Sequence, residues 1–216
     1  PNISVPQVMA GGGADVAIEW MASALVAREK GVPLVNIAQP FERSALMMIC
    51  PKETGVTSEA DFKGKTVVLE WNNPGCPFVR KHYQGNMQSL QKEAAAQGVV
   101  WLAINSTETA SGDYLSPAQL ARWMQDKQAA PTATLMDEDG VVGKAYGARV
   151  TPHMYIVNAQ GVLVYAGGID SIPSSRVDDI PKATPYIRQA LGEIKAGKPL
   201  SVSTSQAYGC SVKYKS

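Results

Sequence analysis

The stretch Lys65–Gln97, KTVVLEWNNPGCPFVRKHYQGNMQSLQKEAAAQ, contains the change of pattern that decides the fold. It opens with the apolar, β-branched run Thr66–Leu69, which is typical of a strand buried on both faces. The polar turn Asn72–Gly75 and then Cys76 follow. Because proline is favoured at the first position of a helix and apolar residues then recur at helical spacing, a helix is predicted over 77–97.

Cys76 therefore lies where a buried strand passes into a helix N-terminus. The dipole and the free N–H groups of a first helical turn stabilise a thiolate, and Arg80 adds positive charge one turn later. This placement predicts that Cys76 is a reactive thiol. The alternative is a small buried apolar cysteine, the commonest role of an isolated one. For Arg80 the alternative is a solvated charge on the helix surface.

The composition limits the classes of partner and site. With 216 residues, a formal net charge of +1 and no basic block, the chain is predicted not to bind nucleic acid. No apolar run approaches the roughly 20 residues that span a membrane. Cys50, Cys76 and Cys210 lie far apart and have no zinc-ligand spacing with either histidine, so no metal and no other cofactor is predicted.

Beyond this stretch, strand and helix patterns continue to the C-terminus. Ser116-Pro117 is a helix start, and the turn at 159–161 joins two short apolar strands as a hairpin. The predicted elements are strands 65–71, 99–105, 132–137, 153–158 and 162–168, helices 77–97, 117–127 and 183–196, and the segment 141–148. Right-handed crossovers make the first strands parallel, so the fold class is α/β, a mixed sheet with helices on both faces.

Residues 1–64 have a different pattern, in the order βαββ, with strands predicted at 15–18, 32–38 and 45–49 and a helix at 23–30. We predict two domains, a small N-terminal segment over 1–60 and a larger domain over 61–216. The N-terminal strands either pair among themselves, join an outer edge of the main sheet or stay loosely ordered. The run Gly11–Gly13 precedes a strand and lacks the frame of a phosphate loop, which argues against a nucleotide site.

Several separate stretches resemble thioredoxin-fold redoxins: EWNNPGCPFVRKHYQGNMQSLQ (70–91), WLAINST (101–107), APTATLMDEDGVVGKAYGARVTPHMYIVNAQGVLVYAGGID (130–170) and YGCSVKY (208–214). More narrowly, the chain over about 61–214 is similar to the peroxiredoxin-related branch of the alkyl hydroperoxide reductase/thiol antioxidant type, whose members carry a Cys-Pro-[Phe/Tyr]-Val site. The resemblance implies a thioredoxin-like mixed sheet flanked by helices, with Cys76 as the nucleophile. It also implies a cis Thr151-Pro152 bond facing Cys76, with an ordinary trans proline at a strand start as the alternative.

The segment up to residue 66 is similar to part of the first lobe of periplasmic substrate-binding proteins of the nitrate, sulfonate and thiamine-precursor type. The matching stretches are QVMAGGGADVAI (7–18), ALVAREKGVPLVNIAQ (24–39) and GVTSEADFKGKTV (55–67). Because both resemblances meet in DFKGKTV, the chain is interpreted as a fusion, without the second lobe that would close a ligand cleft. Both families are commonly exported, which favours a periplasmic or extracytoplasmic location over a cytoplasmic one.

Two departures from the family pattern limit what the resemblance implies. Val79 stands where thioredoxins have the second cysteine of Cys-x-x-Cys, so a disulfide within this motif cannot form. Leu69 and Asn73 occupy the proline and threonine positions of the peroxiredoxin motif, and Asn73 offers an amide in place of the hydroxyl that orients peroxide. Cys210 either resolves an oxidised Cys76 by forming a disulfide, stays a free tail cysteine or pairs with another chain.

The predicted site gathers around Cys76. Its catalytic residues are Cys76, Arg80, Thr151, Pro152 and Cys210, and its substrate-binding residues are Asn73, Pro74, Gly75, Pro77 and Phe78. Among the neighbours, Glu70 is read as a strand-end surface carboxylate, with a partly buried proton-relaying acid as the alternative. Trp71 and Tyr83 are predicted to pack in the core, and His82 is predicted to be exposed.

The leading functional hypothesis is a thiol-based oxidoreductase that reduces peroxide or exchanges disulfides through the single nucleophile Cys76. Its predicted partners are a thiol reductant, a protein disulfide or a peroxide; no oligomeric state is predicted. The first alternative is a non-catalytic thioredoxin-fold binding module, since the second cysteine and the threonine of the related motifs are missing. The second alternative is a remnant of a solute-binding protein.

Overall fold

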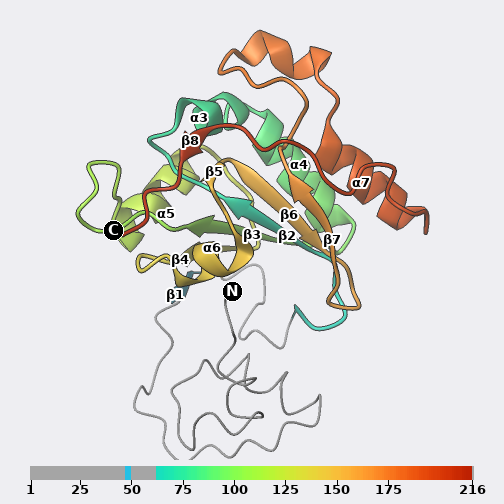
Figure 1. Ribbon diagram of the computed structural model, residues 1–216, viewed down its shortest axis with the longest axis horizontal. Coiled ribbons are helices and arrows are strands. Elements are labelled where there is room, and N and C mark those ends of the chain that lie inside the picture. The colour runs from blue at the N-terminus through green and yellow to red at the C-terminus, as the bar shows by residue number, and fades with distance from the viewer. Residues whose placement is uncertain (1–46, 50–61, 216) are drawn as a thin grey trace, which may run out of the picture. The chain divides into compact units, whose positions relative to one another are not determined.

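The computed structural model describes residues 47–49 and 62–215 (Figure 1). The compact unit that contains them runs from Ala45 to Ser216. The strands predicted at 15–18 and 32–38, the helix at 23–30, the run Gly11–Gly13 and Cys50 lie outside the described residues. The domain boundary near residue 60 stays a prediction.

A six-stranded mixed sheet lies at the centre of this unit, in the order β1-β4-β3-β2-β6-β7. The central strands β2, β3 and β4 run parallel, and β1, β6 and β7 each run antiparallel to a neighbour. The strands are β1 Met47–Ile49, β2 Val67–Trp71, β3 Val100–Asn105, β4 Ala133–Met136, β6 His153–Val157 and β7 Leu163–Gly167. The predicted α/β class with a mixed sheet is confirmed.

The strand β1 is the described part of the strand predicted at 45–49. It pairs antiparallel with β4, with Met47 opposite Met136, so it extends the main sheet at its outer edge. Joining an outer edge is one of the three arrangements that the sequence left open. The strand assigned to the N-terminal segment therefore lies in the same sheet as the strand that precedes Cys76.

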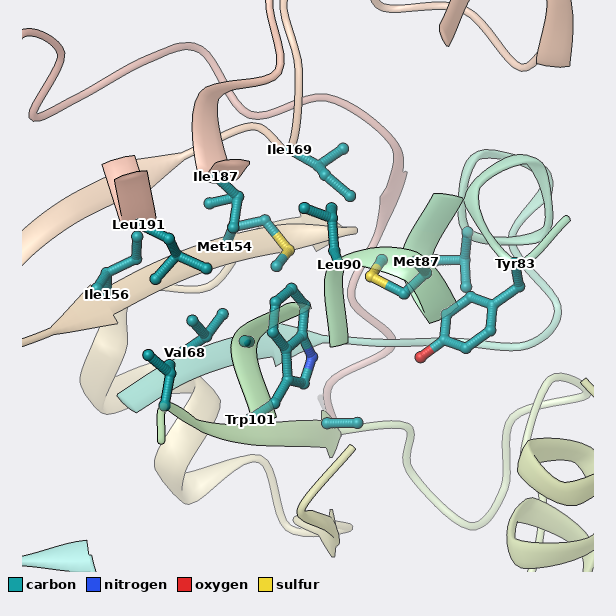
Figure 2. Close-up of a cluster of buried hydrophobic side chains, with 14 of the residues drawn as sticks. Val68, Tyr83, Met87, Leu90, Trp101, Met154, Ile156, Ile169, Ile187 and Leu191 are labelled. Carbon is teal, nitrogen blue, oxygen red and sulfur yellow. The ribbon is translucent and has the colours of Figure 1, made fainter. Parts of the chain in front are cut away.

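Helices cover both faces of the sheet, because successive side chains of its central strands point to opposite sides (Figure 1). On one face, residues of α4 and α7 pack over the β2 and β3 side chains in a single cluster that includes Val68, Met87, Leu90, Trp101, Ile187 and Leu191 (Figure 2). On the other face, Leu69 and Trp71 belong to a second cluster, against which Val142 of α6 packs. The helices are α3 Pro77–His82, α4 Asn86–Ala96, α5 Pro117–Asp126, α6 Val141–Tyr146 and α7 Tyr186–Lys195.

The single helix predicted over 77–97 is wrong: the structure has two helices, α3 and α4, with a break before Gly85. Gly85 has a φ of +116°, a conformation that residues with a side chain rarely adopt. Its N–H is satisfied by Oε1 of Gln88 at 3.0 Å, so α4 starts with a cap of its own. The apolar spacing continues across the break, which is why periodicity alone joined the two helices.

The C-terminal part also differs from the prediction. A 3-10 helix, η3 Val177–Lys182, precedes α7, so the last helix is shorter than the predicted 183–196. The polar tail after α7 forms a short strand, β8 Cys210–Ser211, which pairs antiparallel with β5 Val150–Thr151. This second, two-stranded sheet brings the end of the chain to the residue before Pro152.

Candidate active site

Cys76 lies at the end of the turn that joins β2 to α3. The Asn73 side-chain Oδ1 accepts a hydrogen bond from Gly75 N at 2.7 Å, and its carbonyl oxygen accepts one from Cys76 N at 3.0 Å. Arg80 Nε donates to the carbonyl oxygen of Pro74 at 2.7 Å. Asn73 and Arg80 therefore stabilise the backbone of the turn that presents Cys76.

The sulfur of Cys76 faces the segment that carries Pro152. Cys76 is only 1% exposed, and its thiol donates a hydrogen bond to the carbonyl oxygen of Thr151 at 3.1 Å. The Thr151–Pro152 peptide bond is cis. The tertiary structure thus brings together three of the predicted catalytic residues, one from the β2–α3 turn and two from the end of β5 and the residue after it.

Cys210 reaches the same place from the C-terminal tail. In the pairing of β5 with β8, Cys210 is the residue opposite Thr151, and Thr151 Oγ1 donates to the Cys210 carbonyl oxygen at 3.4 Å. Cys210 is half-buried and packs against the hydrophobic cluster that contains Cys76. Both cysteines are free thiols.

Cys76 lies close enough to Cys210 to influence its ionisation. Burial raises the pKa of Cys210 to about 12, and the neighbouring side chain of Cys76 acts in the same direction. Cys210 therefore stays protonated at neutral pH. The approach of Cys210 to the segment that faces Cys76 is the main feature of the site that the sequence left open.

Two further residues shape the site, and the sequence analysis did not single them out. Gly209 has a φ of +143°, and a Cβ at this position would collide with the carbonyl oxygen of Thr151. Asp113 packs against the turn, since a Cβ on Gly75 would lie 2.7 Å from Asp113 Oδ1, and its charge also raises the pKa of Cys210. The only signal for Gly209 in the sequence is the glycine itself, because glycine is used where two backbones approach closely.

The predicted substrate-binding residues occupy different environments. Asn73 and Pro74 are buried within the turn, while Pro77 is exposed beside it. Phe78 is half-buried, and its ring packs edge-on against the ring of Tyr208 at a centroid distance of 5.8 Å. Substrate contact by these residues stays a prediction.

Glu70 is not the surface carboxylate that the sequence analysis favoured, because its side chain is fully buried under the sheet's central cluster. Its two oxygens accept four hydrogen bonds: Oε1 from Asn72 Nδ2 and Tyr83 OH, both at 2.8 Å, and Oε2 from Trp101 Nε1 at 2.7 Å and Gln91 Nε2 at 3.3 Å. Burial raises the pKa of Glu70, and the four hydrogen bonds oppose the shift. The alternating pattern of β2 places Glu70 on the same face as Val68, which the sequence analysis overlooked.

The prediction that His82 is exposed is also wrong, since His82 is fully buried at the end of α3. The predictions for Trp71 and Tyr83 are confirmed, because both side chains are buried in the core. His82 became buried because the short helix α3 is covered by a tail segment that helical periodicity could not reveal. Its neighbour Lys81 is buried as well.

Residues 47–49 and 62–215 contain no group of three or more histidine, cysteine or acidic side chains with the geometry of a metal site. Among the helices within those ranges, none has the length and apolarity needed to cross a membrane. The described part of the site consists of two thiols, backbone groups and the side chains that hold them.

Comparison with solved structures places the fold among known ones. The chain is 28% identical to an uncharacterized conserved protein from Geobacillus kaustophilus, with 74% of this chain and 82% of that chain covered and a TM-score of 0.65. A hypothetical protein from Sinorhizobium meliloti 1021 is 22% identical, with 84% and 97% covered and a TM-score of 0.66. No curated protein matches the chain.

The comparison with protein families identifies a broader relationship. The model of the AhpC/TSA family matches residues 38–166, a range that includes β1, the turn with Cys76 and the Thr151-Pro152 bond. The match begins well before residue 61 and overlaps the region that resembled substrate-binding proteins, a resemblance that none of these comparisons supports. The chain is a redoxin with a thioredoxin-like fold, and it belongs to the AhpC/TSA family.

Proposed function

We propose that this protein is a thiol oxidoreductase that cycles between a dithiol and an intramolecular Cys76–Cys210 disulfide. The observation that carries the proposal is the meeting of both cysteines at Thr151: the Cys76 thiol donates to the Thr151 carbonyl oxygen, and Cys210 is the residue paired opposite Thr151. Membership in the AhpC/TSA family supports a thiol-based redox function. The proposal replaces the single-cysteine mechanism with one that uses both cysteines.

With a hydroperoxide as oxidant, the thiolate of Cys76 attacks the peroxide oxygen, the O–O bond breaks and the alcohol or water leaves after taking a proton. Cys76 becomes a sulfenic acid. The sulfur of Cys210 then bonds to the sulfur of Cys76, the S–O bond breaks, and the proton of the Cys210 thiol passes to the leaving oxygen, which departs as water. Two thiols and one peroxide have thus given one disulfide, one alcohol and one water, and an external thiol reductant restores the dithiol.

With a disulfide as oxidant, the same two residues act in the same order. Cys76 attacks one sulfur of the substrate and releases the first substrate thiol, which leaves a mixed disulfide. Cys210 then attacks Cys76, releases the second substrate thiol and closes the same intramolecular disulfide. Both routes therefore share one oxidised product and differ only in the oxidant.

The burial of Cys76 favours a small oxidant over a protein disulfide. The thiol is 1% exposed in the reduced protein, and β8 occupies the hydrogen-bonding edge of β5 beside it. We therefore propose a hydroperoxide as the first substrate to test and a low-molecular-weight disulfide as the second.

The test is oxidation of the reduced protein by one equivalent of hydrogen peroxide, or of a small disulfide, in a Cys50→Ser background. The expected result is the loss of two thiols per chain and a Cys76–Cys210 linked peptide in mass spectrometry. Cys210→Ser should instead retain a sulfenic acid at Cys76 that dimedone traps, and Cys76→Ser should react with neither oxidant. If neither oxidant yields the linked peptide, the proposal fails and the binding-module alternative is favoured.

A further inference from the structure

A buried polar cluster lies behind the two cysteines and takes no part in the chemistry proposed above. It consists of Lys81 and His82 at the end of α3, Asp170 after β7, and Tyr208 before β8. The side chains of Lys81 and His82 are fully buried, and Asp170 and Tyr208 are 4% and 9% exposed. Burying charged and polar side chains costs free energy unless they are paired, so the position of this cluster needs an explanation.

Asp170 is the centre of this cluster. Its Oδ1 accepts hydrogen bonds from Tyr208 OH at 2.5 Å and from Ile172 N at 3.1 Å. Its Oδ2 lies 3.6 Å from Lys81 Nζ and 3.7 Å from His82 Nε2, beyond hydrogen-bonding distance, and is a buried oxygen without a partner. The Tyr208 hydroxyl is therefore the only side-chain hydrogen-bond donor to Asp170 among the described residues.

Tyr208 makes further contacts with α3. Its hydroxyl lies 3.3 Å from His82 Nε2, and Lys81 Nζ lies 5.6 Å from the centroid of its ring. Burial lowers the pKa of His82 to about 4, so His82 is neutral at pH 7 and acts as a hydrogen-bonding group. The hydroxyl of one tyrosine thus meets both α3 and Asp170.

The position of the cluster in the chain connects it to the site. Lys81 and His82 lie on the helix that begins after Cys76, and Tyr208 is two residues before Cys210. After Cys210, the two-residue pairing of β8 is extended by backbone hydrogen bonds from Val212 N to Arg149 O and from Glu108 N to Lys213 O, while Tyr208 lies on the other side of Cys210. A side-chain anchor next to this short strand would decide how often Cys210 faces Cys76.

We propose that Tyr208 is a positioning residue, whose hydroxyl, bound to Asp170, holds Cys210 against Cys76. The effect on catalysis rests on the proposed function, because the step that Tyr208 accelerates is the attack of Cys210 on oxidised Cys76. The geometric part, the anchoring of the tail, is independent of the reaction.

The test compares Tyr208→Phe with Tyr186→Phe in the Cys50→Ser background. Tyr208→Phe keeps the ring and removes only the hydroxyl, and Tyr186 is a half-buried tyrosine of α7 whose hydroxyl has no hydrogen bond to another described residue. The first measurement is the rate at which a maleimide labels Cys76 and Cys210 in the reduced protein. Tyr208→Phe should increase both rates about tenfold, equivalent to about 1.4 kcal/mol of tail opening, and Tyr186→Phe should leave them unchanged.

The second measurement is the partition of oxidised Cys76 between capture by dimedone and closure of the disulfide with Cys210. Tyr208→Phe should raise the captured fraction about tenfold at low dimedone, while the rate of peroxide consumption by Cys76 does not fall. A purely structural role would lower both steps together with the melting temperature, and that result would overturn the proposal. Unchanged maleimide labelling would overturn it as well.

The two measurements separate the two proposals. If the wild-type chain forms no Cys76–Cys210 disulfide, the proposed function fails, yet the maleimide rates still report whether Tyr208 anchors the tail. If the disulfide forms but Tyr208→Phe changes neither labelling nor partition, the anchor fails and the proposed function stands.

Discussion

Phe78, two residues after Cys76, packs its ring edge-on against Tyr208, two residues before Cys210, with an angle of 68° between the ring planes. The segments that carry the two cysteines are therefore joined by aromatic packing as well as by the pairing of β5 with β8. Aromatic pairs in this geometry contribute roughly 0.5–1.5 kcal/mol beyond the area that they bury.

A double-mutant cycle should measure this contact. We expect Phe78→Leu and Tyr208→Leu to be coupled by about 1 kcal/mol in the free energy of unfolding, because each single substitution already removes the ring pair. Urea denaturation of the reduced protein gives the four free energies. A coupling energy near zero would show that the two rings are neighbours without an energetic interaction.

Gly209→Ala should displace Cys210 from the site. An alanine Cβ would collide with the Thr151 carbonyl oxygen, and the φ of +143° at Gly209 is itself strained for alanine, so β8 cannot pair with β5 as in the wild type. We expect disulfide formation with Cys76 to fall at least tenfold, as measured by thiol titration after peroxide treatment.

The control for this substitution is Gly112→Ala. A Cβ on Gly112 meets no atom within 4 Å, and its φ is not positive. It should leave both disulfide formation and stability close to those of the wild type. Normal disulfide formation in Gly209→Ala would contradict the close approach of the two backbones.

Substitutions of Glu70 should separate the need for hydrogen-bond acceptors from the need for charge. Glu70→Gln should change the free energy of unfolding by less than about 1 kcal/mol, because Asn72 Oδ1 has no partner and can accept from the new amide after a flip of the Asn72 side chain. Glu70→Leu should cost about 2–5 kcal/mol, since it leaves Trp101 Nε1 and Tyr83 OH without their acceptor.

Chemical denaturation followed by tryptophan fluorescence measures both changes, and Glu108→Gln, at a half-exposed position, serves as the control. Equal losses of stability for Glu70→Gln and Glu70→Leu would mean that the network depends on the negative charge rather than on its acceptor oxygens.

Stability should fall as the pH decreases from about 6.5 to 4. Burial lowers the pKa of His82 and of His153 to about 4, so in this range the unfolded chain binds more protons than the folded protein and acid favours unfolding. Each histidine contributes up to about 3 kcal/mol over the window. Glu70, with its raised pKa, acts in the opposite direction and reduces the slope.

His153→Asn tests the size of this effect, because an asparagine oxygen can replace the Nδ1 that lies 3.1 Å from Tyr155 OH and 3.4 Å from Arg149 N. Urea midpoints between pH 4 and 7.5 should decline less steeply in the variant. A slope equal to that of the wild type would exclude His153 as a source of the pH dependence.

The sequence alone determined the local parts of the site. The apolar run of β2, the turn and Pro77 predicted Cys76 at the start of a helix, and Ser116 was correctly predicted as a helix cap, since its hydroxyl accepts from Gln119 N. Such features depend on residues a few positions apart, whose hydrogen bonds and backbone preferences act within one element. The resemblance of the longer motifs supplied the thioredoxin-like fold and the importance of Pro152.

Only the tertiary structure decided what faces each element. Cys210 meets Cys76 because β8 pairs with β5, and His82 is buried because the tail with Tyr208 covers α3. Periodicity tells which side of an element a residue occupies, but the partner on that side comes from distant parts of the chain. Glu70 shows the same limit. This strand-end carboxylate is tolerated in the core only because it accepts four hydrogen bonds, one from the nearby Asn72 and three from residues in other segments.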